Sequence, residues 1–141
     1  GERLKEDLFD KLDGMIKDVD AIEDRYPQIM TEYREKLTLK VEELLGDAQM
    51  EEGRIAAEVI LFADKICTDE ETVRLRSHIE SMREELLSGG SVGRKLDFLA
   101  QEMNREANTI LSKANDLETS NRAINLKTEI EKVREQIQNI E

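Results

Sequence analysis

The stretch "GRKLDFLAQEMNREANTILSKANDL", residues 93–117, decides the fold class because its apolar and polar residues separate cleanly with helical periodicity. At 100° per residue, its apolar side chains share one face of a helix. They are Leu96, Leu99, Met103, Ala107, Ile110, Ala114 and Leu117. A second face holds short polar side chains with little net charge, namely Asp97, Gln101, Arg105, Asn108 and Ser112. The stretch therefore predicts an amphipathic helix running to about Leu117, with one side in a core.

Working outward, the same spacing of threes and fours recurs along the chain. It marks helices over residues 2–24, 28–45, 51–66 and 69–88, and a last helix after a break at 118–121. The last helix spaces its apolar side chains 4-3-4-3, as a coiled coil does; they are Leu126, Ile130, Val133, Ile137 and Ile140. Since no segment shows strong strand periodicity, the sequence predicts an all-α fold.

Helix boundaries follow from local signals. Pro27 lacks a backbone donor and disfavours helix at Tyr26, so it predicts a break between two long helices. We expect residues 1–46 to form a projecting antiparallel hairpin that ends at Gly46, and residues 47–141 to form a helical core of about four helices. Within this single domain, 51–66 is the most apolar segment and is expected to be the most buried. Thr68 and Glu71 have the spacing of a capping box for the next helix.

Composition narrows the functional class. Of 141 residues, 38% are hydrophobic and 38% charged, while aromatics make up 4%, so the core must be aliphatic. No apolar run approaches the length of a membrane span, which argues against a membrane role. Cys67 is the single cysteine, so no intrachain disulfide is possible, as in cytoplasmic proteins.

Charge is unevenly distributed. The net charge is −12, yet residues 91–141 hold 8 Lys+Arg against 9 Asp+Glu, whereas residues 1–90 hold 13 against 24. Free nucleic acid would be repelled by the first ninety residues, so any contact surface must come from residues 91–141 or from another domain. Because there is no basic recognition helix, a DNA-reading role has no support.

Glu102 and Glu106 stand four apart on the shoulder of the apolar stripe. A carboxylate at that boundary needs a partner, because burying it unpaired is costly. On spacing alone, pairing with Lys or Arg of neighbouring helices is favoured. The alternative is a divalent-metal site, because paired acids on one helix present oxygen ligands.

Further candidates surround these acids. His78, the single histidine, lies at the edge of a predicted apolar stripe, as a structural residue or as a metal ligand or general acid/base. Arg94 and Lys95 follow a Gly-Gly-Ser-Val-Gly run, where helix amides and two cations could hold a phosphate. The polar face from Asp97 to Ser112 looks too uncharged for a solvated face, which favours buried or interfacial hydrogen bonding, with a ligand surface as the alternative.

Two segments resemble a known family. "SHIESMREELLSGGSVGRKLDFLAQEMNREANTILSKAND" and the terminal "LKTEIEKVREQIQNIE" are similar to the C-terminal region of the bacterial YicC/YloC family. The similarity is tight over 77–141 and looser over 1–76. Where that family has "GGP", this chain has "GGS" at 89–91. Members of the family are about twice as long and have an N-terminal domain rich in strands, so the start "GERLKEDL" is expected to be that of an excised C-terminal fragment.

The resemblance implies a divalent-metal-dependent endoribonuclease, with a metal of the Mg or Mn class, that assembles as a ring-like homo-oligomer around RNA. It suggests that His78, Glu102 and Glu106 belong to the active region, together with the polar face near Asp97, Arg105 and Asn108. From their chemistry, we expect His78, Glu102 and Glu106 to ligate metal or transfer protons, and Arg94, Lys95, Arg105 and Asn108 to contact RNA. The alternative is a non-catalytic helical oligomerisation or scaffold module of a stress- or RNA-related protein.

Overall fold

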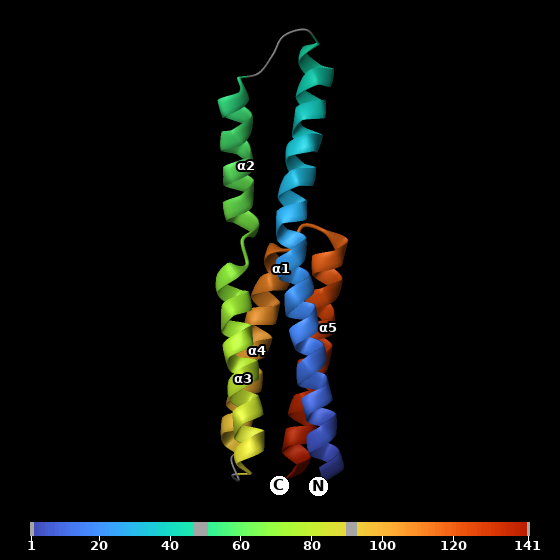
Figure 1. Ribbon diagram of the computed structural model, residues 1–141, viewed down its shortest axis with the longest axis vertical. Helices are drawn as coiled ribbons and strands as arrows, with labels where there is room; N and C mark the ends of the chain where they lie inside the picture. Colours follow the sequence, from blue (N-terminus) through green and yellow to red (C-terminus); the bar gives the residue numbers. More distant parts are fainter. Residues whose placement is uncertain (1, 47–50, 90–92, 141) are drawn as a thin grey trace.

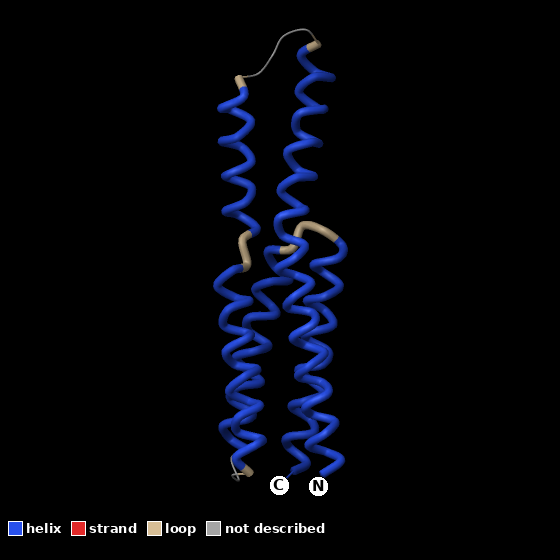
Figure 2. Tube along the Cα trace, viewed as in Figure 1, coloured by secondary structure: helices blue, strands red, loops and turns tan. Residues whose placement is uncertain are grey.

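All regular structure in the described part of the chain is helical. The computed structural model describes residues 2–46, 51–89 and 93–140. These ranges hold α1 (Glu2–Leu45), α2 (Glu52–Ile66), α3 (Asp69–Ser88), α4 (Gly93–Lys113) and α5 (Leu117–Ile140). Figure 2 shows no strand among the described residues. The all-α prediction is confirmed.

The body is a four-helix bundle made by the N-terminal half of α1 together with α3, α4 and α5 (Figure 1). Each helix contributes one aliphatic face, and burying each large side chain stabilises the fold by about 2 kcal/mol. The fully buried large side chains of this core include Leu8, Leu12, Met15, Leu75, Ile79, Met82, Met103, Ile110, Leu126 and Ile130. The predicted number of about four packed helices is confirmed, although the N-terminal half of α1 takes the place of segment 51–66 among them. The predicted core face of the last helix from Leu126 to Ile137 is also confirmed.

A two-helix arm extends beyond the bundle (Figure 1). We call residues 28–45 of α1 and the whole of α2 the arm. Its two helices are joined by a stacked Tyr33–Phe62 pair, with ring centroids 3.8 Å apart, while at its base the Tyr26 hydroxyl donates to Ala63 O at 2.7 Å. The prediction that 51–66 is the most buried helix is wrong: Ile60 is 67% exposed, because α2 packs mainly on α1 and contributes no residue to the bundle core.

Pro27 does not break the chain. It lies inside α1, which runs unbroken for 44 residues, about 66 Å. The predicted hairpin within residues 1–46 is therefore wrong: the hairpin of the arm is formed by α1 and α2, and the N-terminal half of α1 belongs to the core. Pro27 is exposed, and packing holds the helix on both sides of it, through Ile22 in the bundle and Tyr33 in the arm.

Of two other boundary predictions, the N-cap at Thr68 is confirmed without its capping box, and the break at 118–121 is wrong. Thr68 is the N-cap of α3, but its side chain makes no cap hydrogen bond, and Glu71 is buried and paired with Lys113 rather than completing a capping box. The break predicted at 118–121 lies instead at 114–116, where α4 has ended and Asp116 accepts a hydrogen bond from Thr119 N at 3.1 Å to start α5. The other predicted ends hold: Gly46 and Gly89 have φ of 61° and 69°, which glycine adopts without strain.

Candidate functional site

Ion pairs fix the register of α3 against α4. These helices are antiparallel neighbours, and a step along one is matched by an equal step back along the other. The pairs are Lys113 Nζ–Glu71 Oε1 at 2.6 Å, Arg74 Nε–Glu106 Oε2 at 2.6 Å and Lys95 Nζ–Glu85 Oε1 at 2.7 Å. From these pairs, each position of α3 can be matched to the position of α4 that lies opposite it.

This register places His78 level with Glu102. His78 lies one turn after Arg74 on α3, and Glu102 lies one turn before Glu106 on α4. Both residues are half-buried. We call Arg74, His78, Glu102 and Glu106 the seam. His78 and Glu102, which are 24 positions apart in the sequence, therefore lie at the same height along the paired helices α3 and α4.

Glu106 is the buried member of the seam. It is 5% exposed, and its carboxylate accepts the hydrogen bond from Arg74. This pairing with a cation of the neighbouring helix is the alternative that spacing favoured, and it removes the cost of burying a lone charge. The hydrogen bond to Glu106 is also the main cause of the raised pKa of Arg74. Glu102 pairs within its own helix, with Arg105 Nη1 at 3.5 Å.

The expected three-ligand metal site is not gathered in one chain. Among the described residues, no three His, Cys, Asp or Glu side chains lie close enough together to hold a metal ion. Glu106 is engaged by Arg74, which leaves His78 and Glu102 as the donors that the seam presents. Because Mg²⁺ is often held by one or two carboxylates together with phosphate oxygens of a bound ligand, these two donors suit an ion that binds together with such a ligand better than one held by protein donors alone.

The outer side of α4 forms a face without carboxylates. We call it the α4 strip; it consists of Arg94, Phe98, Gln101, Arg105, Asn108 and Ser112, all exposed. The expectation that this polar face is buried within the chain is wrong, because these side chains point to solvent. Asp97 lies at its margin, held by Arg134 Nε at 3.2 Å and Gln101 Nε2 at 2.8 Å. In a chain of net charge −12, a surface with two arginines and no acid stands out.

The cations expected at the start of α4 are placed differently. Arg94 is exposed on the strip, whereas Lys95 turns toward α3 and pairs with Glu85. The phosphate cradle predicted from the glycine run involves Gly90–Val92, which lie outside the described residues. From Arg94 to Asn108, the strip spans about 21 Å along the helix, so its residues do not form one compact centre.

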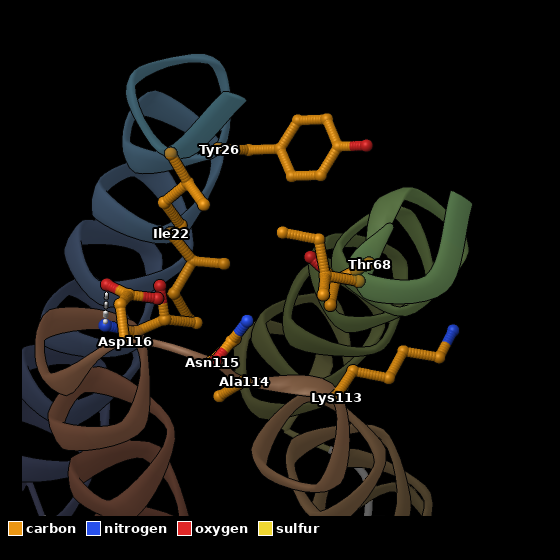
Figure 3. Close-up of a pocket in the computed structure, with 10 residues that line it drawn as sticks. Ile22, Tyr26, Thr68, Lys113, Ala114, Asn115 and Asp116 are labelled. Atoms are coloured by element: carbon orange, nitrogen blue, oxygen red, sulfur yellow. Dashed lines mark hydrogen bonds between the residues drawn. The ribbon is translucent and has the colours of Figure 1, made fainter. Parts of the chain in front are cut away.

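The pocket in Figure 3 is too small for a ligand larger than water. It lies where the arm joins the bundle and is lined by Ile22, Tyr26, Thr68, Lys113 and Asp116, among others. Its volume is ≈ 10 Å³, room for about one water molecule. A nucleotide does not fit there, so a ligand of that size would have to bind on open surface.

The sequence prediction named neither Arg74 of the seam nor Phe98 of the strip. Glu106 requires a cation, and Arg74 is one candidate. The residues around Arg74 in the sequence do not distinguish it from the other arginines of α3. Phe98 could have been found from the sequence, because it is an aromatic residue on the polar side of an amphipathic helix. In the structure it is 57% exposed. An exposed aromatic ring between arginines is a common base-stacking element in proteins that bind single strands.

Comparisons of the sequence with known proteins assign the chain to a family. The family model described as "Endoribonuclease YicC-like, C-terminal" matches residues 22–141. The chain belongs to this family. The resemblance seen in the sequence is confirmed, and the chain represents the C-terminal domain of YicC-like endoribonucleases.

Two curated relatives match the chain over its whole length. The probable endoribonuclease YicC of Clostridioides difficile is 45% identical over 142 residues, and that of Haemophilus influenzae is 38% identical over 141. In both cases the chain spans about half the length of the relative, 48%. Among the described helices, none is long and apolar enough to cross a bilayer.

Proposed function

We propose that this domain carries the seam at which a YicC-like endoribonuclease binds RNA and cleaves its phosphodiester bonds, in the cytoplasm. The observation that carries the proposal is the placement of His78 level with Glu102, directly beside the carboxylate-free α4 strip. RNA approaching an acidic protein is drawn to the surface where repulsion is weakest and cations stand.

The residues have separable roles in this proposal. Arg94, Arg105 and Asn108 contact the RNA backbone along the strip, and Phe98 stacks on a base. Lys95 contacts RNA from the edge of the strip, with part of its charge already balanced by Glu85. Half-buried His78 transfers a proton at the scissile phosphate.

Metal dependence is part of the same proposal. Glu102 would hold a divalent ion of the Mg or Mn class together with phosphate oxygens, and Glu106 would act through Arg74. His78 would be a further ligand of this ion only in place of the proton transfer described above. Such an ion, when bound, lowers the pKa of a water and offsets negative charge on the phosphate. A chelator should abolish cleavage, and added Mg²⁺ or Mn²⁺ should restore it; cleavage that is unchanged by the chelator would contradict this part.

The test is cleavage of a labelled single-stranded RNA by the complete protein that contains this chain. Glu102→Gln and His78→Gln should each lower the rate constant of cleavage by at least about 100-fold, because each removes a group that acts on the reacting atoms. The matched control is Glu129→Gln: Glu129 is similarly exposed and paired three residues on, with Lys132 at 3.3 Å. If both seam variants fold and cleave RNA like the control, the seam is not the active region.

A second proposed function is self-association through the arm. Large apolar side chains are exposed on both of its helices, at Leu39, Leu44, Ile60 and Leu61. Two helices that pack mainly on each other bury little apolar surface, so a further partner that covers their exposed apolar side chains would stabilise them. A second copy of the arm would complete a four-helix arrangement like that of the body, and this scaffold role is compatible with RNA cleavage in an oligomer.

A further inference from the structure

Arg74 differs from an ordinary surface arginine because a buried carboxylate holds it in place. Its Nε donates to Glu106 Oε2 at 2.6 Å, and Glu106 is 5% exposed, whereas the Arg74 side chain is 48% exposed. The other group that contacts the guanidinium among the described residues is Glu70 Oε2, 3.5 Å from Nη1, at the limit of a hydrogen bond. Nη1 therefore holds one long contact, with a Glu70 side chain that is 83% exposed and that a phosphate would displace, and among the described residues Nη2 is left for an incoming ligand.

Burial of Glu106 explains why the arginine keeps this orientation. Moving the guanidinium away would leave a nearly enclosed carboxylate unpaired, which is costly. A guanidinium fixed through Nε presents its two Nη groups in a plane that matches two oxygens of a phosphate. A lysine in this position could neutralise Glu106 but could not also present such a fork.

The position of the pair connects it with the rest of the seam. Arg74 is one turn, about 6 Å, from His78 on α3, and Glu106 is one turn from Glu102 on α4. An anion bound at the Nη groups would lie beside the residues proposed for cleavage rather than at a remote part of the bundle. No sequence motif assigned Arg74 to this role.

We propose that Arg74 binds an RNA phosphate through its Nη groups and that Glu106 is a positioning residue that fixes Arg74, not a direct ligand of metal or RNA. This rests on the proposed function of the seam. It also reverses the electrostatic expectation for Glu106, because removal of this negative charge should weaken RNA binding instead of strengthening it.

The bundle offers a matched control on its other side. Arg122 Nη1 binds buried Asp18 at 3.1 Å, and the Arg122 side chain is 44% exposed. This pair also joins two helices across the bundle, α1 and α5, and it lies outside the seam and the α4 strip. Arg122→Met should cost similar stability and leave RNA binding unchanged.

The experiment measures binding of a labelled single-stranded RNA to the complete protein at several salt concentrations, together with kcat and KM for its cleavage. Arg74→Met should raise Kd and KM about tenfold and reduce the salt slope of log K by about 0.7, the contribution of one single-strand phosphate. Arg74→Lys should recover part of the charge but not the lost affinity. Glu106→Gln should weaken binding, with a smaller change in slope.

Each outcome decides between the possibilities. If Arg74→Met binds RNA like Arg122→Met, or if Glu106→Gln binds RNA more tightly than the wild type, the proposal is overturned, because Glu106 is then only an opposing charge. Should Arg74→Met fail to fold, the Arg74→Lys and Glu106→Gln variants still decide. A wild-type protein that binds RNA with the Arg74-dependent slope but does not cleave it would contradict the proposed function and leave this inference standing.

Discussion

Asp18 is a carboxylate on the core side of α1, and the fold supplies two partners for it from α5. Arg122 Nη1 donates to Oδ1 at 3.1 Å and Asn125 Nδ2 donates to Oδ2 at 2.7 Å, while Asp18 itself is 2% exposed. Each oxygen therefore has its own donor. A charge in this position costs little only while both donors stay in place.

Asp18→Ala should accordingly lower the free energy of unfolding by about 2 kcal/mol, because two charge-assisted or polar hydrogen bonds to a buried group are lost. Urea denaturation followed by circular dichroism measures it. Asp13→Ala is the control: Asp13 binds Arg83 at 2.7 Å but is exposed, so its loss should cost less than about 1 kcal/mol. Equal costs for the two variants would mean that burial of Asp18 does not matter.

Also at the scale of single residues, the sequence predicted that Glu106 needs a cationic partner, but not which residue this partner is. The boundary position of Glu106 on the apolar stripe required a cation, and the structure supplies Arg74, 32 residues away. Arginine and lysine recur along α3 and α4, and their identity as partners depends on the helix register, which is set by packing. The level placement of His78 and Glu102 has the same origin, so the candidate residues were predictable and their grouping was not.

At the scale of elements, periodicity predicted the helices well because the apolar face of each one is set by its own sequence. The failure at Pro27 has a physical reason. The local rule counts one lost hydrogen bond and a steric clash, about 3 kcal/mol, against continuing the helix. The N-terminal half of α1 packs on the bundle and its C-terminal half packs on α2, and this packing outweighs the cost of Pro27. The sequence around Pro27 does not show that both halves of the helix have such partners.

Asp116 is a single residue that controls the junction of several elements. It accepts from Thr119 N at the start of α5 and from Arg25 Nε of α1 at 3.2 Å. Burial by itself would raise the pKa of Asp116, but the hydrogen bonds from Thr119 and Arg25 outweigh it, so its pKa is lowered from 3.8. A lowered pKa in the folded state means that the carboxylate stabilises the fold above its ordinary pKa and loses that contribution as the pH falls through the folded value.

Asp116→Ala should therefore reduce stability at neutral pH by about 1 kcal/mol, the usual cost of removing a helix cap. The difference from wild type should be constant above about pH 5 and should narrow as the pH falls below 3.8. Thermal melts from pH 2.5 to 7 measure it. Asn115→Ala, at the exposed neighbouring position, should leave the pH profile unchanged. A gap that widens in acid would show that the charge of Asp116 is unfavourable in the folded protein.

At the scale of the whole molecule, the arm and the bundle expose different surfaces. The α4 strip lies on the bundle, and half of the large apolar side chains that are exposed among the described residues lie on the arm, at the end of the molecule distant from both termini (Figure 1). The arm's own core is thin, since within α2 the buried residues are Ile55 and Ile66. An isolated helical pair of this kind gains most from a partner that covers its apolar side, and another copy of the same arm meets that requirement by symmetry.

Leu44→Glu and Ile60→Glu should therefore shift the purified chain toward the monomer, raising the dissociation constant of self-association at least tenfold, because each places a charge where an apolar contact is proposed. Sedimentation velocity over a range of protein concentrations measures the shift. Leu87→Glu is the matched control, since Leu87 is equally exposed but lies at the end of α3, near the opposite end of the molecule. The arm is the contact if the control associates like wild type and the arm variants do not. A wild-type chain that stays monomeric at every concentration, or a control that dissociates as the arm variants do, would place any self-association elsewhere and leave the arm's apolar side to a different partner.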